Sequence, residues 1–240
     1  MQVTKYSEGF VVLIVTLSMS KTAIILGATG LTGGLLTELL IKDPAFSKVK
    51  IFTRRPTSFT HEKVEEIICD LLDTSTFKEQ FTGDVVFCCI GTTKAQTPDR
   101  YKYRAIDYGI PIETAQLAKQ QGIASYMVIS SAGTSAKSPF FYVRTKGEME
   151  RDLSKVGIEN TYILKPAFIN GRPDDARKGE KALKMMMAVM DFFMVGPLKK
   201  WKSTQAKDIA RAMAQLAKQT VTHTDITNIE IKELSSAYHV

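Results

Sequence analysis

Tyr142 and Lys146 lie four positions apart in a segment, 142–156, whose composition favours a helix, so their side chains would share one helix face. A free tyrosine side chain titrates near ~10, so it acts as an acid at neutral pH only with help from a positive charge. An ammonium about 4 Å away, at an effective dielectric of about 20, contributes roughly 4 kcal/mol, which corresponds to about three pH units. Ser131 ends a predicted strand shortly before, and its hydroxyl could bind a substrate carbonyl while Tyr142 donates a proton. The three residues predict acid catalysis at a carbonyl group; the alternative is an exposed helix with an incidental tyrosine–lysine pair.

Three glycines, at positions 27, 30 and 33, separate a β-branched apolar run at 22–26 from a leucine-rich segment at 35–40. The run predicts a strand buried on both faces, and the leucine pairs one turn apart predict a helix. Glycine lets the backbone approach a pyrophosphate closely, and the unpaired N–H groups at the start of the helix bind it. The segment therefore predicts a dinucleotide site, with an ordinary glycine-rich turn as the alternative. The residues expected to contact the dinucleotide are Gly27, Thr29, Gly30, Leu31, Thr32 and Gly33.

Strands and helices alternate along the rest of the chain. Apolar runs predict strands at 48–53, 64–68, 85–90, 126–129 and 161–164, and helices are predicted at 103–121 and 142–156. This alternation predicts an α/β fold with a doubly wound parallel sheet of the Rossmann type, in which ligands bind at the carboxyl ends of the strands. The groups expected at those ends, besides the glycine turn, are Arg54, Arg55, Asp70, Leu71, Gly91, Thr92, Thr93, Ser131 and Pro166.

Arg54 follows the second predicted strand about twenty residues after Gly33, where an acidic residue would bind the ribose hydroxyl of NAD. An arginine there accommodates the 2′-phosphate of NADP, so the sequence favours NADP over NAD; the alternative is that Arg54 and Arg55 are a solvated surface pair. Lys146 would then also hold the nicotinamide ribose. Asp70 and Leu71 could frame the adenine, or Asp70 could cap the turn that follows it; both interpretations stay open.

Composition limits the class of protein. The 240 residues carry a formal charge of +7, which suits an anionic ligand, but the basic residues are scattered and no nucleic-acid interface is expected. The three cysteines, Cys69, Cys88 and Cys89, form no metal-binding pattern, and the adjacent pair falls within a predicted buried strand. We therefore expect no metal site, a reduced intracellular protein and a cytoplasmic location.

The chain is expected to form one domain with short additions at both ends. Residues 1–18 are predicted to be an extension that is peripheral to function, because their apolar run is too short to span a bilayer. The alternatives are a membrane tether and an export signal. Residues 19–240 are predicted to form the nucleotide-binding domain. Its last part, about 167–240, would form a small substrate-side cap with helices at 181–193 and 206–219 and a strand at 227–231.

The glycine pattern, Arg54 and the set Ser131, Tyr142 and Lys146 resemble the short-chain dehydrogenase/reductase superfamily in its atypical branch. Five further stretches resemble the Tat-interacting-protein-like oxidoreductases, a resemblance that covers about residues 20–235. They are Gly91-Thr92-Thr93-Lys94, Ser130-Ser131, Phe141-Tyr142, Lys146-Gly147-Glu148 and Lys165-Pro166-Ala167. The resemblance implies an NADP-binding Rossmann domain with a Ser–Tyr–Lys site, but it implies no particular substrate.

The sequence thus predicts an NADP-dependent reductase or dehydrogenase that acts on a small carbonyl or alcohol. The main alternative is a cofactor-sensing protein that binds a protein partner and has little or no turnover. A nucleotide-sugar epimerase or dehydratase is a third reading, but residues 167–240 are too few for the larger substrate domain of those enzymes. A homodimer is compatible with each of these.

Overall fold

The computed structural model describes residues 20–171 and 203–239. The predicted extension at 1–18 and the predicted helix at 181–193 lie outside these ranges.

A seven-stranded parallel sheet forms the centre of the molecule, with the strand order β3-β2-β1-β4-β5-β6-β9. Its strands are β1 (Lys21–Leu26), β2 (Phe46–Thr53), β3 (Val64–Ile68), β4 (Val85–Cys88), β5 (Ser125–Ile129), β6 (Asn160–Lys165) and β9 (Asp225–Thr227). The chain moves outward in one direction from β1 to β3 and then returns to continue from β4 on the other side of β1. This reversal between β1 and β4 confirms the predicted doubly wound α/β fold and marks the edge where such sheets bind ligands.

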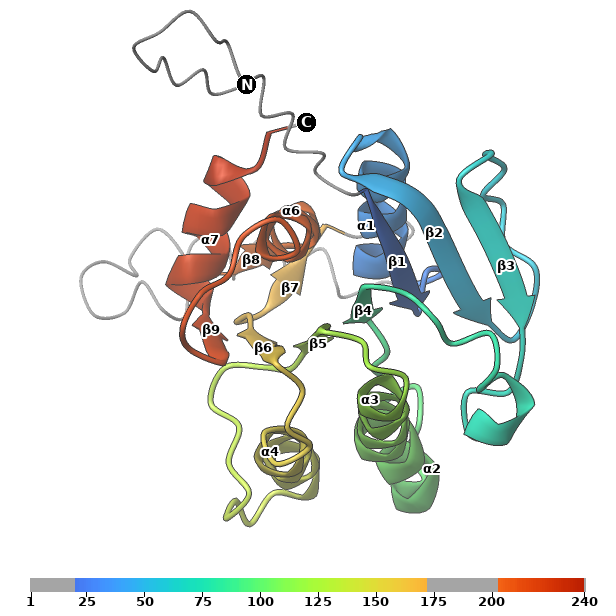
Figure 1. Ribbon diagram of the computed structural model, residues 1–240. Coiled ribbons are helices and arrows are strands. Elements are labelled where there is room, and N and C mark those ends of the chain that lie inside the picture. Colours follow the sequence, from blue (N-terminus) through green and yellow to red (C-terminus); the bar gives the residue numbers. More distant parts are fainter. Residues whose placement is uncertain (1–19, 172–202, 240) are drawn as a thin grey trace, which may run out of the picture.

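Helices cover both faces of this sheet (Figure 1). One face carries α1 (Leu31–Lys42), α6 (Ala206–Leu216) and α7 (Asn228–Ala237); the other carries α2 (Arg100–Arg104), α3 (Ile110–Gln120) and α4 (Phe141–Leu153). A 3-10 turn η1 (Thr74–Thr76) and a small parallel ladder of β7 (Ile169–Asn170) with β8 (Thr204–Gln205) complete the described elements. The helices bury the sheet on both sides, which explains why its strands are almost continuously apolar.

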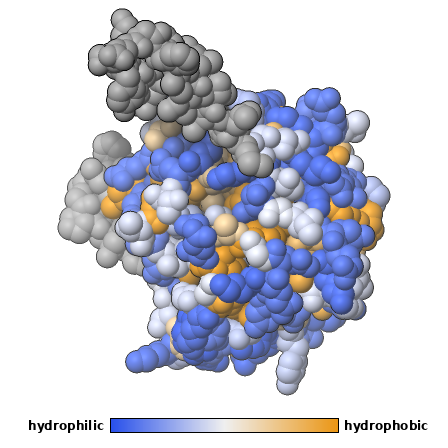
Figure 2. All heavy atoms as spheres, in the orientation of Figure 1, coloured by the Kyte–Doolittle hydropathy of each residue, from blue (hydrophilic) through white to orange (hydrophobic). Residues whose placement is uncertain are grey.

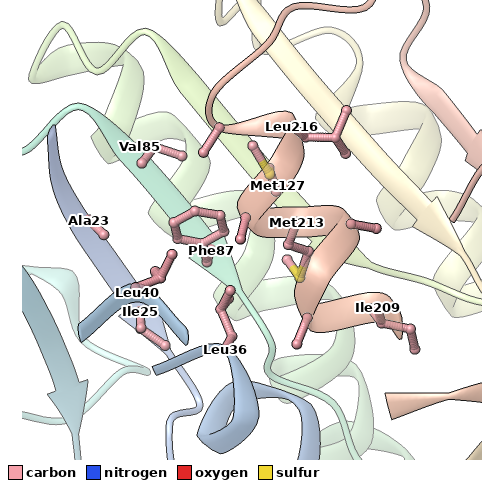
Figure 3. Close-up of a cluster of buried hydrophobic side chains, with 14 of the residues drawn as sticks. Ala23, Ile25, Leu36, Leu40, Val85, Phe87, Met127, Ile209, Met213 and Leu216 are labelled. Atoms are coloured by element: carbon pink, nitrogen blue, oxygen red, sulfur yellow. The ribbon is translucent and has the colours of Figure 1, made fainter. Parts of the chain in front are cut away.

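Alternating strand residues build two separate cores. Ala23, Ile25, Val85 and Phe87 point towards α1 and α6, where Leu36, Leu40, Ile209, Met213 and Leu216 meet them (Figure 3). Their neighbours Ile24, Leu26, Val86 and Cys88 point to the opposite face and pack beneath α3 and α4. Each fully buried Leu, Ile or Phe side chain contributes about 1.5–3 kcal/mol to folding. Cys88 is thus a core residue, as predicted, and burial raises the pKa of its thiol.

The helix predicted at 103–121 is divided into three parts. Between α2 and α3 lies a π-helical turn η2 (Ala105–Gly109), in which the N–H of Ile110 bonds to the carbonyl of Ala105. Pro111 follows at the start of α3 and has no N–H to continue the α-helical ladder. The wider π turn therefore stands where the regular helix is interrupted, and π turns often mark functional sites.

The strand predicted at 227–231 is wrong beyond its first residue. Thr227 ends β9 and caps α7: its hydroxyl accepts the N–H of Glu230, and the Glu230 carboxylate accepts the N–H of Thr227 at 2.8 Å. This reciprocal pair is a capping box, and it starts a helix where the β-branched residues suggested a strand. Short β9 nevertheless extends the main sheet beyond β6.

The face of the molecule in Figure 2 is mostly hydrophilic, with apolar atoms gathered over the middle of the sheet. None of the helices within the described ranges has the length and hydropathy needed to cross a bilayer.

Candidate active site

The glycine turn after β1 is shaped for close contact with a ligand. Gly27 has a φ of +89°, and a Cβ there would lie 3.0 Å from the carbonyl group of Cys89. At Gly33, a Cβ would overlap the carbonyl oxygen of Gly27, so the start of α1 packs directly on the turn. Only glycine fits both positions without moving the backbone. The turn thus leaves no side chain between the backbone and a bound group.

The first turn of α1 presents free N–H groups at this place. Its N-cap, Gly30, supplies no capping side chain, and none of the residues in the first turn is acidic. Unpaired N–H groups and the positive end of the helix dipole attract a phosphate. Thr29 and Gly30 are exposed, Leu31 is half-buried and Thr32 is buried. The cradle therefore fits the pyrophosphate of a dinucleotide.

A second cluster lies at the end of β4, the neighbour of β1. The Lys146 ammonium lies 3.0 Å from Oδ1 of Asp107, whose side chain is wholly buried, and the N–H of Thr92 donates to Oδ2 at 2.9 Å. A Cβ on Gly91 would lie 3.7 Å from Asp107 Oδ1 and 4.0 Å from Lys146 Nζ. The structure thus brings Gly91, Thr92 and Lys146 together around a carboxylate from the π turn.

The Asp107–Lys146 contact is an ion pair without the alignment of a hydrogen bond. Oδ1 of Asp107 accepts no hydrogen bond from any described residue. An ammonium has three donors and no acceptor. The buried carboxylate therefore holds the charge of Lys146 in place, and the three donors of the ammonium exceed what one carboxylate oxygen can accept.

Tyr142 lies one helical turn before Lys146, among other aromatic rings. The Tyr103 ring is perpendicular to it at 4.6 Å between centroids, and Phe141 packs at 5.4 Å. Burial, together with the charge of Asp107, raises the pKa of Tyr103, which stays a neutral phenol. The half-buried Tyr142 has a hydroxyl that bonds to no other described residue. Tyr142 therefore presents a phenol hydroxyl without a partner among the described residues, one helical turn before Lys146.

Ser131, at the end of β5, is joined to α4 only through its neighbours. Within residues 20–171 and 203–239 its hydroxyl makes a single long contact, 3.5 Å to the carbonyl of Ala132. Ser130 and Thr134, on either side, both donate to the buried carboxylate of Glu150 on α4, Thr134 at 2.6 Å. Glu150 also pairs with Lys165 at the end of β6, at 3.0 Å. Glu150 therefore ties two strand ends to the helix that carries Tyr142 and Lys146.

The remaining predicted residues fall into three environments. Arg54 and Arg55 are exposed after β2, and neither guanidinium has a partner among the described residues. Asp70 caps the next turn by accepting the N–H of Leu72 at 3.0 Å, whereas the Leu71 side chain is buried in the core. Pro166 is buried, and its carbonyl accepts the N–H of Ala132 at 2.8 Å. Thr93 is exposed beside Thr92. The capping role of Asp70 is thus observed, and an adenine contact stays a prediction.

Three residues of this region were not predicted. Asp107 and Glu150 are carboxylates whose partners come from distant parts of the chain, and their spacing in the sequence carries no signal of this. Gly147 lies where a Cβ would overlap the backbone of Ser135 and Ala136, so it lets the loop after β5 rest on α4. A glycine directly after Lys146, within a predicted helix, was the sequence feature that could have indicated this close approach.

Two hollows lie in the described part of the chain. One, of about 330 Å³, is lined by the groups around Glu150: Thr134, Gly147, Glu150, Lys165 and Asp225. The other, of about 270 Å³, lies at the opposite edge of the sheet beside Lys21, Asp84, Asn160 and Tyr162. The polar groups of that edge bond to one another, for example Asp84 to the N–H of Thr22. We place the candidate site at the carboxyl edge, where the free donors lie.

A reversal of strand order, a glycine turn beneath a helix N-terminus and polar groups on the neighbouring strand ends define a dinucleotide-binding Rossmann protein. The sequence model of the NAD(P)H-binding family matches residues 27–220. The chain belongs to this family.

Two fungal relatives carry names that describe mitochondrial proteins. "Protein fmp52, mitochondrial" of Aspergillus clavatus is 32% identical over 203 residues, which cover 81% of this chain and 85% of the relative. "Protein FMP52, mitochondrial" of Candida albicans is 35% identical over 152 residues, 61% of this chain and 66% of the relative. These names overturn the expected cytoplasmic location. Composition and cysteine content indicated only a reducing compartment and could not distinguish one organelle from another.

Solved structures share the fold at low identity. The Bordetella bronchiseptica enzyme WbmH, in complex with NAD+, superposes with a TM-score of 0.63 at 18% identity, covering 91% of this chain and 80% of WbmH. A short-chain dehydrogenase/reductase superfamily protein from Agrobacterium tumefaciens with bound NAD gives 0.62 at 13% identity, covering 85% and 76%. The fold is thus that of short-chain dehydrogenase/reductase neighbours.

Proposed function

We propose that this chain is an NADP-dependent oxidoreductase that interconverts a small carbonyl compound and its alcohol. The observation that carries the proposal is the arrangement on α4. Lys146, fixed by the buried Asp107, lies beside Gly91 at the switch point, and Tyr142 offers an unpartnered hydroxyl one turn earlier.

The cofactor would lie along the carboxyl edge of the sheet. The Gly27–Gly33 turn would hold the pyrophosphate, the Gly91–Thr93 and Pro166 backbones would line the groove, and Lys146 would bind the nicotinamide ribose. Arg54 and Arg55 support NADP, because two unpaired guanidinium groups after β2 suit a 2′-phosphate. When bound, the reduced cofactor supplies the hydride.

The side chains would then handle the oxygen and its proton. Ser131 would donate a hydrogen bond to the carbonyl oxygen, and the Tyr142 hydroxyl would give that oxygen its proton. Lys146 would stabilise the resulting phenolate through its positive charge. Asp107 would hold the ammonium between Tyr142 and the ribose without consuming all of its donors.

Two finer assignments belong to the same proposal. The motifs around Gly91, Tyr142, Lys146 and Pro166 support membership of the atypical, Tat-interacting-protein-like branch of the short-chain dehydrogenases/reductases. The names of the fungal relatives support a mitochondrial location for this chain as well.

The test is cofactor binding by calorimetry followed by turnover of a broad carbonyl panel, with oxidation of NADPH as the readout. We expect Tyr142→Phe to abolish turnover and keep NADPH affinity. Tyr101→Phe, which changes a tyrosine on α2 that is 89% exposed, should keep both. Tight NADPH binding with no turnover of any carbonyl or quinone would contradict the oxidoreductase proposal and favour a cofactor-sensing protein. In that case the affinity for a protein partner should change with NADPH.

A further inference from the structure

Aromatic rings gather around Tyr142. Tyr103, Phe141 and Tyr142 contact one another edge to face, at 4.6 to 6.0 Å between centroids. Phe140, the residue before α4, is 72% exposed, whereas Tyr103 is almost wholly buried. A buried ring thus supports two half-buried rings, one of which carries the free hydroxyl. We refer to Tyr103, Phe141 and Tyr142 as the ring cluster.

Two cations without carboxylate partners border the ring cluster. The Lys94 ammonium lies 5.8 Å from the centre of the Tyr142 ring, and the Arg100 guanidinium lies 5.3 Å from that of Phe141. Both side chains belong to exposed residues, and neither forms an ion pair or a hydrogen bond with any described residue.

The carboxylates of the same region already have partners. Asp99 caps α2 by accepting the N–H groups of Tyr101 and Lys102, and Asp107 pairs with Lys146. Glu148 pairs with Arg104 and with Arg144. The charge left over beside the ring cluster is therefore positive and is carried by Lys94 and Arg100.

From this juxtaposition we propose that the site takes an aryl carbonyl compound bearing an anionic group, of which a carboxylate is the simplest. The inference rests on the proposed role of Tyr142, because that role places the carbonyl oxygen at the ring cluster. An aromatic ring packs well against other aromatic rings, and a carboxylate pairs with the two cations. A short aliphatic aldehyde lacks the ring, and a neutral aryl aldehyde lacks the charge.

A matched pair of aldehydes tests the charge. We expect kcat/KM with NADPH to be about tenfold higher for para-carboxybenzaldehyde than for para-methylbenzaldehyde, since each exposed charge pair contributes up to about fivefold. This ratio should fall towards one in the double variant Lys94→Gln/Arg100→Gln, and it should fall in the wild type as salt is raised. Lys78→Gln/Lys207→Gln removes two exposed lysines from other elements and should leave the ratio as it is. Pyruvate, which has the charge but no ring, should be the poorer anionic substrate.

A binding arm separates this inference from the proposed activity. Calorimetry on the NADP+-loaded protein compares para-(hydroxymethyl)benzoate with para-methylbenzyl alcohol, and needs no turnover. We expect the carboxylate to bind more tightly than the neutral alcohol, and we expect this preference to be lost in Lys94→Gln/Arg100→Gln. That result supports the ligand class even if no aldehyde is reduced; the absence of reduction would overturn only the proposed reductase activity. Equal binding of the two alcohols, or a preference that survives the double variant, overturns the ligand class.

Discussion

The ammonium of Lys146 lies 3.0 Å from Asp107, a carboxylate that is 0% exposed, while the lysine side chain itself is 17% exposed. One helix thus supplies the cation, and a π turn of the preceding helical segment supplies its counter-charge. The pair makes the candidate site depend on the packing of α4 against η2, and not on the Tyr-x-x-x-Lys spacing alone.

Replacing Asp107 should separate stability from function. Asp107→Asn leaves the ammonium largely buried without a counter-charge, and removing one partner of such a pair costs about 3 kcal/mol. We expect urea unfolding to show this loss, and calorimetry to show weaker NADPH binding. The double variant Asp107→Asn/Lys146→Met should regain most of the stability without regaining turnover. Restored turnover in that variant would contradict the role of Lys146.

Glu150 should matter more than its neighbour Glu148. Glu150→Gln weakens the contacts that hold Ser130, Thr134 and Lys165, and we expect a loss of about 1–3 kcal/mol in the free energy of unfolding, together with a lower kcat. Glu148→Gln, on the same helix, removes only contacts to the partly exposed Arg104 and Arg144 and should change stability by less than about 1 kcal/mol. Equal effects of the two variants would contradict the inference that Glu150 holds the strand ends against α4.

A methyl group at Gly147 should displace the Ser131 loop. In Gly147→Ala the added Cβ overlaps the backbone of Ser135 and Ala136, so the loop must move away from α4. We expect a destabilisation of about 1–3 kcal/mol and a loss of turnover. Gly109→Ala is the matched control, since the nearest atom there lies 3.9 Å away, and it should be neutral or slightly stabilising.

The cofactor preference should follow Arg54. Arg54→Gln removes a guanidinium that has no other partner among the described residues, so it should weaken NADPH binding by about tenfold to a hundredfold and barely affect NADH. The two dissociation constants, measured by calorimetry on wild type and variant, give the answer. An equal loss for both cofactors would show that Arg54 does not contact a 2′-phosphate.

Asp43 should control stability in acid. Burial opposes its ionisation, but hydrogen bonds from Lys218 at 2.8 Å, the N–H of Ala45 and Tyr238 outweigh this and hold the pKa of Asp43 below its ordinary value of 3.8. A carboxylate with a lowered pKa stabilises the fold above the pKa of the unfolded chain, and this contribution is lost as the pH falls through the native pKa. Asp43→Asn should therefore be less stable at neutral pH and show a flatter decline below about pH 4. Parallel acid limbs for wild type and variant in urea unfolding would contradict this.

The sheet and the glycine turn could be predicted because their signals are local. Strands buried on both faces are continuously apolar, and the turn needs glycine at fixed offsets, so β1 and a helix after the turn were expected. The helix α1 begins at Leu31, earlier than the leucine-rich segment at 35–40 indicated. The strand predicted at 227–231 failed because the capping box of Thr227 and Glu230 outweighs the β-branched composition. The π turn η2 precedes Pro111, where the helical hydrogen-bond pattern is interrupted. The spacing of apolar residues does not reveal this change in hydrogen bonding.

The site could be predicted only in part, for a related reason. Tyr142 and Lys146 share a helix, so their spacing is visible in the sequence. Their supports, Asp107 and Glu150, depend on contacts between elements that are distant in the chain. The location was predicted wrongly because no side-chain chemistry of the folded domain distinguishes a mitochondrion from the cytoplasm.

A crystal structure of the protein with NADP+ would show whether the cofactor lies beside Tyr142 and Lys146. We expect the pyrophosphate on the N–H groups of the Gly27–Gly33 turn, the 2′-phosphate at Arg54, and the nicotinamide ribose within hydrogen-bond distance of Lys146, with the Tyr142 hydroxyl facing the nicotinamide. A dinucleotide bound elsewhere, or a nicotinamide remote from Tyr142 and Lys146, would contradict this expectation.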